Sequence, residues 1–339
     1  MSTTAFKMIQ IARQGVGTPE TSLAAERQIG GTVTVTPVID WHRPMDDNGK
    51  LSEHERSIIV GKRSILRYEG DAIYEELHHW FGMALKGAVA PTRPGTGLTY
   101  VWTFTPSLTT LNAQDTYMFE VGDNTEEWDV DGVVCTDLEL NYTPDEVVSL
   151  RAGLEGRFPV QGGSFTTLAE PSVSGAIEIV SNDTTIWIDS TWANLGTSAI
   201  SATIASMTVK FPTGISRAKF LSGALSTPFE SQEQVEGKRH FEIEMELIMG
   251  TNGLAQYNAW KADTARAIRI KTTHGTVIDG NGSPDLQIDM IGRFTSNPEL
   301  FGDRNGQTTI RLTFSSFHDG LGNECSVIVT NANASDAVV

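Results

Sequence analysis

The side chains that could bind a metal ion are present, but their spacing argues against a site. The segment DGNGSPD, residues 279–285, carries side-chain oxygens at alternating positions, as a calcium-binding loop does. Pro284 stands where such a loop needs glycine, and Met290 stands where it needs a bidentate glutamate. We therefore interpret residues 279–285 as a hairpin turn.

The histidines and cysteines also lack metal-binding spacing. His78 and His79 are adjacent, so they cannot both face one ion on a helix, and no HExxH motif accompanies them. We expect a half-exposed pair beside an apolar stripe. Cys135 and Cys325 are the only cysteines, which rules out a thiolate zinc site and a disulfide framework and favours a reducing cytoplasm during folding.

Motifs that would indicate catalysis are missing. The chain has no GxSxG elbow, phosphate-binding Walker loop, GxGxxG fingerprint or zinc-deaminase signature. With 42 acidic residues, carboxylate pairs arise by accident, and nothing selects one pair for a glycoside hydrolase. The sequence predicts a protein that is not an enzyme and has no cofactor or metal.

One acidic pattern stands above this background. In residues 241–247, FEIEMEL, a period of two places Glu242, Glu244 and Glu246 on one face of a strand and the apolar side chains on the other. Asp137 and Glu139 alternate with leucines in the same way. Aligned like charges repel, so two interpretations stay open: an ordinary solvated sheet face, or a wall that must not attract polyanions.

Composition limits the partners. The 339 residues include 25 Lys and Arg against 42 Asp and Glu, a net charge of −17. That balance disfavours binding to duplex phosphates or to an anionic membrane. No apolar run is long enough to span a bilayer, and the first residues lack the hydrophobic core of a signal peptide.

The elements that would position these residues are mostly strands. Residues 1–30 are expected to form a loop or an arm that orders on assembly. A strand from Thr32, a polar hairpin tip at 42–56 and a returning strand follow. A helix then opens with Asp71 as its N-cap and carries an apolar stripe that includes Leu77, Trp80 and Phe81. Further strands are expected near 98–105, 115–122, 132–143 and 146–157.

The second half repeats this order at an offset of 180 residues. Strands near 202–211 and 239–250 flank a second polar tip at 223–238, and a helix over about 253–263 carries Tyr257 and Trp260, which match Leu77 and Trp80. Strands near 266–273, 285–293, 308–316 and 325–330 follow. We predict a duplicated chain, with one half at 1–165 and the other at 166–339.

The sequence resembles the major tail tube proteins of long, non-contractile-tailed bacteriophages over about residues 11–331. The resemblance rests on element order and on four segments: GVGTPE at 15–20, RSILRYEGDAIYEELHHWFGMALKG at 63–87, DGVVCTDLELNYTPDEVVSLRAGLEGR at 131–157, and TIASMTVKFPTGISRAKFLSG at 203–223.

This resemblance implies a mainly β, duplicated β-sandwich fold with one flanking helix per half. Inner strands of neighbouring subunits would join into a barrel, and three duplicated chains would form a ring that imitates a hexamer. The rings would stack into a tube in the virion, after assembly in the host cytoplasm. The lumen would admit DNA and the tape measure protein, with tail terminator and distal tail proteins at the ends and no membrane contact. Lumen-lining residues would be Glu242, Glu244, Glu246, Asp137 and Glu139; ring-stacking tips would include Asp46, Asp47, Asn48, Glu53, Glu230 and Glu233.

Two other functions stay open. A distal tail or baseplate hub protein would share the fold but form a single ring. A carbohydrate-binding β-sandwich adhesin should present exposed aromatic platforms, whereas Trp41, Trp80 and Trp260 lie in apolar or helix-stripe contexts.

Overall fold

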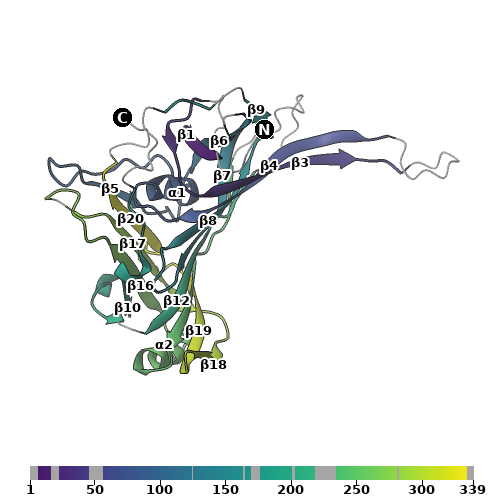
Figure 1. The fold of residues 1–339 in the computed structure, drawn as a ribbon. Coiled ribbons are helices and arrows are strands. Elements are labelled where there is room, and N and C mark those ends of the chain that lie inside the picture. Colours follow the sequence, from purple (N-terminus) through teal and green to yellow (C-terminus); the bar gives the residue numbers. More distant parts are fainter. Residues whose placement is uncertain are drawn as a thin grey trace.

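A computed structural model of the chain describes residues 7–16, 23–45, 56–123, 125–162, 165–168, 176–200, 203–217, 234–280 and 282–333. The fold is mainly β and sandwich-like, as predicted, with two α-helices among the described residues (Figure 1). One hydrophobic core runs through both halves.

One long antiparallel sheet, which we call the long sheet, joins the two halves. Its first four strands come from the first half and its last four from the second. In spatial order they are β3 (Thr32–His42), β4 (Ile58–Asp71), β8 (Ser149–Gly156), β7 (Glu127–Tyr142), β12 (Ile204–Pro212), β15 (Glu242–Ile248), β19 (Gln307–Ser316) and β18 (Glu299–Arg304). The halves meet where β7 pairs with β12.

A second layer covers the apolar face of each half. Over the first half, β7 continues into a sheet with β2 (Arg27–Gln28), β1 (Met8–Val16), β6 (Asp115–Gly122) and β9 (Val160–Gln161). Over the second half lie β11 (Ala199–Ile200), β10 (Thr184–Asp189), β16 (Arg266–Thr273), β17 (Asp285–Phe294), β20 (Cys325–Asn331) and β5 (Tyr100–Phe104). Short elements complete the fold: β13 (Ile215–Arg217) with β14 (Gln234–Glu236), and two 3-10 turns at Ser181–Asp183 and Trp192–Asn194.

Strand β5 crosses the predicted boundary between the halves. It belongs to residues 1–165, yet it pairs with β20 at the edge of the second half's outer layer. The two halves therefore share a strand and a core, although each contributes its own block of four strands to the long sheet.

The N-terminal segment contains a strand, where an arm or loop was predicted. Residues 8–16 form β1, which pairs along its length with β6 and buries Ile9 and Ile11. The alternation of apolar and polar residues in MIQIARQGV is a strand pattern, and the long-range partner more than 100 residues away completes it.

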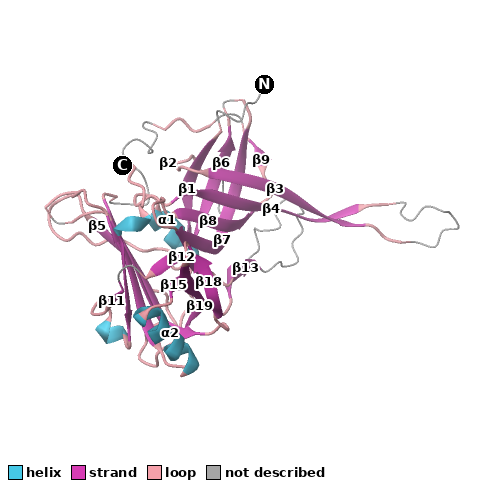
Figure 2. Ribbon diagram, turned by 60° about the horizontal axis from the view of Figure 1, so that its bottom comes forward, coloured by secondary structure: helices cyan, strands magenta, loops and turns pink. Residues whose placement is uncertain are grey.

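The helices occupy the predicted regions with different bounds. Helix α1 spans Leu77–Ala84 and α2 spans Thr251–Lys261 (Figure 2). Asp71 is not the N-cap of α1, because it ends β4 and the cap position falls on Glu76. Pairing of Asp71 with Ser149 of β8 extends the strand at the expense of the helix.

Candidate assembly surface

The long sheet has one apolar face and one polar face. On β15 the exposure alternates as predicted: Ile243, Met245 and Leu247 are buried in the core, and Glu242, Glu244 and Glu246 are half-exposed on the opposite face. This polar face is the candidate site, because it runs without a break across both halves.

The structure brings the two predicted acidic sets together. Lys210 of β12 lies between Glu139 of β7 and Glu242 of β15, paired in register with both. Asp137 lies on the same face, opposite Pro212. Residues about 100 positions apart in sequence therefore share one cross-strand row.

Basic side chains are interleaved with these carboxylates. Lys210 Nζ lies 2.6 Å from Glu244 Oε1, and this hydrogen bond raises the pKa of Lys210. Glu246 accepts a 2.8 Å hydrogen bond from the Thr309 hydroxyl and lies 3.3 Å from Arg304; the first contact is the main cause of its lowered pKa. The net charge around Glu242, Glu244 and Glu246 is therefore less negative than the sequence of β15 alone suggests.

The first half repeats the arrangement. Arg151 of β8 forms a 2.7 Å ion pair with Glu69 of β4, and Arg63 lies 3.8 Å from Glu155. Because these pairs are at the surface, each contributes little to stability. Together they make the polar face of the first half mixed in charge, with two bases beside two acids.

Both ends of the long sheet are open edges. Among the described residues, β3 forms a strand pairing only with β4, and β18 only with β19. An unpaired strand edge is a ready template for another strand.

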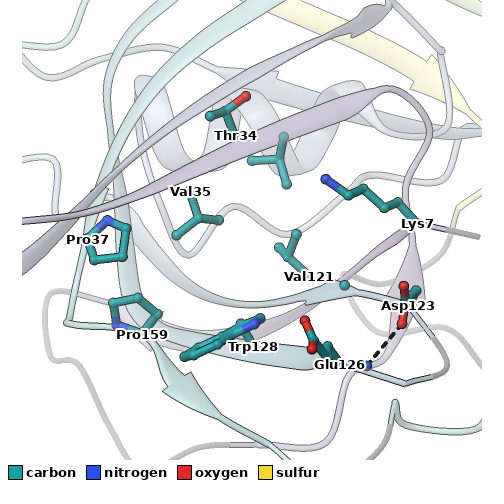
Figure 3. Close-up of a pocket in the computed structure, with 11 residues that line it drawn as sticks. Lys7, Thr34, Val35, Pro37, Val121, Asp123, Glu126, Trp128 and Pro159 are labelled. Carbon is teal, nitrogen blue, oxygen red and sulfur yellow. Dashed lines mark hydrogen bonds between the residues drawn. The ribbon is translucent and has the colours of Figure 1, made fainter. Parts of the chain in front are cut away.

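Beside β3, apolar side chains between the long sheet and the outer layer are also accessible to solvent. A groove runs between β3 and the outer layer, with Trp128 39% exposed (Figure 3). Figure 3 shows Lys7, Asp123 and Glu126 at one end of this groove. Its apolar lining consists of Val33, Val35, Pro37, Val121, Trp128 and Pro159.

The opposite edge carries exposed apolar side chains. On β18, Leu300 is 38% exposed and Phe301 is 81% exposed. Phe301 sits in a bulge between Leu300 and Gly302 with a φ of 63°. The run ELFGDR is short and shows no clean alternation, so the sequence does not predict this strand.

The hairpin tips lie mostly outside the described residues. This holds for Asp46, Asp47, Asn48, Glu53, Glu230 and Glu233, so their stacking role stays a prediction. The strands that lead to the first tip, β3 and β4, project far from the body as a two-stranded arm (Figure 1).

The helix residues lie against the core. Leu77, Trp80 and Phe81 of α1 are buried, and Tyr257 and Trp260 of α2 are half-buried with ring centroids 5.6 Å apart.

His78 and His79 are not half-exposed, as predicted, but buried. The His78 ring stacks on Trp102 with centroids 4.6 Å apart, and His79 Nδ1 lies 3.0 Å from the Tyr117 hydroxyl. Helix α1 is enclosed on every side, so both faces of its stripe are interior, and burial lowers the pKa of both imidazoles.

Residues near 279–285 form a turn in which the Ile278 N–H donates a 2.9 Å hydrogen bond to the Gly282 carbonyl oxygen. The Asp279 carboxylate accepts hydrogen bonds from the Thr99 backbone N–H and from its hydroxyl, at 3.0 and 2.7 Å. Asp279 thereby ties this turn to the segment that leads into β5.

Comparison with known proteins adds no identification. Neither a scan against protein-family models nor a search of the curated proteins finds a match to this chain. In the described part of the chain, no helix is long and apolar enough to cross a membrane.

Proposed function

We propose that this protein is a virion tail tube subunit, in which three chains close into a ring through their long sheets and the rings stack into a tube. The observation that carries the proposal is the continuous long sheet, which joins two equivalent four-strand blocks and ends in two unpaired edges.

The two blocks share one plan. In each, a strand leads into a long hairpin, the returning strand precedes a helix, and a later hairpin adds the third and fourth strands. The spatial orders β3-β4-β8-β7 and β12-β15-β19-β18 therefore correspond, which makes β18 the counterpart of β7 and β3 the counterpart of β12.

The pairing of β7 with β12 inside the chain, which we call the internal joint, suggests how two chains would pair. Since β7 pairs with β12 in antiparallel register from Tyr142 with Met207 to Asp137 with Pro212, β18 of one chain should pair with β3 of the next. Repetition of a head-to-tail contact closes into a ring when the rotation fits.

Burial supports the same pairing. At the internal joint, Leu140 of β7 and Val209 of β12 are both fully buried. At the open edges their counterparts remain accessible: Val33 and Val35 are only half-buried, and Leu300 is 38% exposed. Joining the edges would remove this apolar surface from water.

The polar face would then line the lumen. On β7, β12 and β15 the acids of this face outnumber Lys210, and they would repel the phosphates of a passing polyanion and keep it mobile. In this role the partners are further copies of the chain, the tape measure protein and genomic DNA inside the tube, and terminator and distal tail proteins at its ends.

A distal tail or hub protein is the second candidate, because the same open edges would also close a single ring. Negative-stain microscopy of the purified chain separates the two. We expect uniform tubes of stacked rings; isolated rings that never stack favour the hub, and monomers at every concentration contradict both.

A further inference from the structure

Three carboxylates gather on the outer layer of the first half. Glu120 of β6 pairs in register with Asp129 of β7, and Glu127 lies two residues before Asp129 on the same face. One oxygen from each of the three lies within 4.8 Å of the others. The opposite face of these strands carries Phe119 and Val130 into the core.

The cluster is enclosed by the chain. Glu120 and Glu127 are each 4% exposed. Glu120 is held in place by the Thr166 hydroxyl at 2.6 Å, the Thr166 N–H at 3.0 Å and the Ala25 N–H at 3.3 Å. Gly162 passes so close that a Cβ there would lie 2.7 Å from Glu127 Oε2.

Two oxygens of the cluster have no hydrogen-bond donor. Glu127 Oε2 and Asp129 Oδ1 are closed to solvent, and neither accepts a hydrogen bond from the described residues. A buried carboxylate oxygen without a partner costs free energy, which a bound cation would offset.

Among the described residues, acidic groups surround Asp129. The pKa of Asp129 is raised to about 7, first by burial, then by the neighbouring Glu127, and further by Glu120 and Asp131. The charged groups that shift this pKa are acids, whereas Asp115 and Asp289 elsewhere in the structure form ion pairs with Arg13 and Arg269.

We propose that Glu120, Glu127 and Asp129 bind one divalent cation of the calcium class. Calcium takes oxygen ligands at about 2.3–2.6 Å, so two oxygens on opposite sides of one ion lie about 4.8 Å apart, and the observed spacing fits within this limit. Water or backbone carbonyls would complete the coordination. The ion would fasten the β6–β7 hairpin to the segment around Gly162 and Thr166.

Titration of the chelator-treated full-length protein with CaCl₂ in a calorimeter tests the proposal. We expect one ion per chain and a rise in thermal midpoint on adding Ca²⁺, with Mg²⁺ binding more weakly. Glu127→Gln should weaken binding at least tenfold. The matched control is Glu126→Gln, which removes one charge from the exposed neighbouring residue and should bind as the parent does.

Thermal unfolding in EDTA shows whether each variant is folded. If Glu127→Gln is not folded, Asp129→Asn takes its place in the titration. No Ca²⁺ heat and no thermal shift with the parent protein would overturn the site, whatever the tube assay shows. Equal weakening by the Glu126 and Glu127 variants would overturn it as well.

Discussion

At the scale of single residues, Glu76 links stability to pH. Its Oε1 accepts a 3.0 Å hydrogen bond from the Gly30 N–H, and its side chain is 2% exposed. Burial raises its pKa from 4.5 to about 7, against opposing contributions from Gly30 and Arg27. The native protein therefore retains a proton that the unfolded chain releases, and the free energy of unfolding should fall as pH rises from about 4.5 to 7.

Glu76→Gln should remove this dependence. A pKa shift from 4.5 to about 7 corresponds to at most about 3 kcal/mol of unfolding free energy. The difference in unfolding free energy between Glu76→Gln and the parent should therefore become more favourable to the variant, by up to that amount, between pH 5 and pH 7.5. Urea unfolding at the two pH values measures it, with the exposed Glu146→Gln as control. Parallel pH profiles for parent and Glu76→Gln would contradict the assignment.

The alternation on β15 predicts opposite outcomes for adjacent residues. Ile243→Glu places a carboxylate in the core at a fully buried position and should cost several kcal/mol, enough to abolish soluble expression. Glu244→Gln should change the free energy of unfolding by less than about 1 kcal/mol, since its pair with Lys210 is at the surface. Comparable losses in chemical denaturation would show that the two faces are misassigned.

The faces of β15 were predictable because a period of two is local. The cations were not, because Lys210 and Arg304 reach the glutamates through strand register, which brings together segments tens of residues apart. The carboxylate cluster was missed for the same reason: Glu120 joins Glu127 and Asp129 through the β6–β7 pairing.

At the scale of elements, long, well-patterned strands were predictable and edge or crossing strands were not. The expected strands at 115–122, 266–273 and 285–293 match β6, β16 and β17 closely. Strands β1 and β18 depend on long-range pairing partners that cannot be identified from the local sequence. Chain order alone likewise does not indicate that β5 pairs with β20. Helix α1 was predicted too long because β4 pairs with β8 as far as Asp71.

The open edge β18 gives an element-scale prediction. Leu300→Asp should leave the monomer folded, since Leu300 is 38% exposed, but should prevent pairing with β3 by placing a charge in an apolar joint. Sedimentation velocity should show monomers of this variant under conditions where we expect rings or tubes of the parent. Val277→Asp, at a residue 60% exposed on another turn, is the control and should assemble normally. Normal assembly of Leu300→Asp would exclude this edge from the joint.

At the scale of the whole molecule, the charge of the polar face should govern DNA passage. Changing Glu242, Glu244 and Glu246 together to Gln removes three acids per chain, leaves Arg304 without its carboxylate and leaves Lys210 with Glu139 alone. These freed cations would bind passing phosphates, so tubes should form but genome ejection should slow, most at low salt. Ejection timed by dye fluorescence tests this prediction; an unchanged rate at low salt would contradict an acidic lumen.

The central claim is that β18 of one chain pairs with β3 of the next. A cryo-electron microscopy map of the assembled protein that resolves individual strands tests it most directly. The account predicts three chains per ring, each contributing the eight strands of its long sheet, with β18 and β3 antiparallel at every subunit boundary and Glu242, Glu244 and Glu246 facing the lumen. A ring of six chains, or one in which β3 and β18 stay unpaired with the glutamates outside, would contradict it.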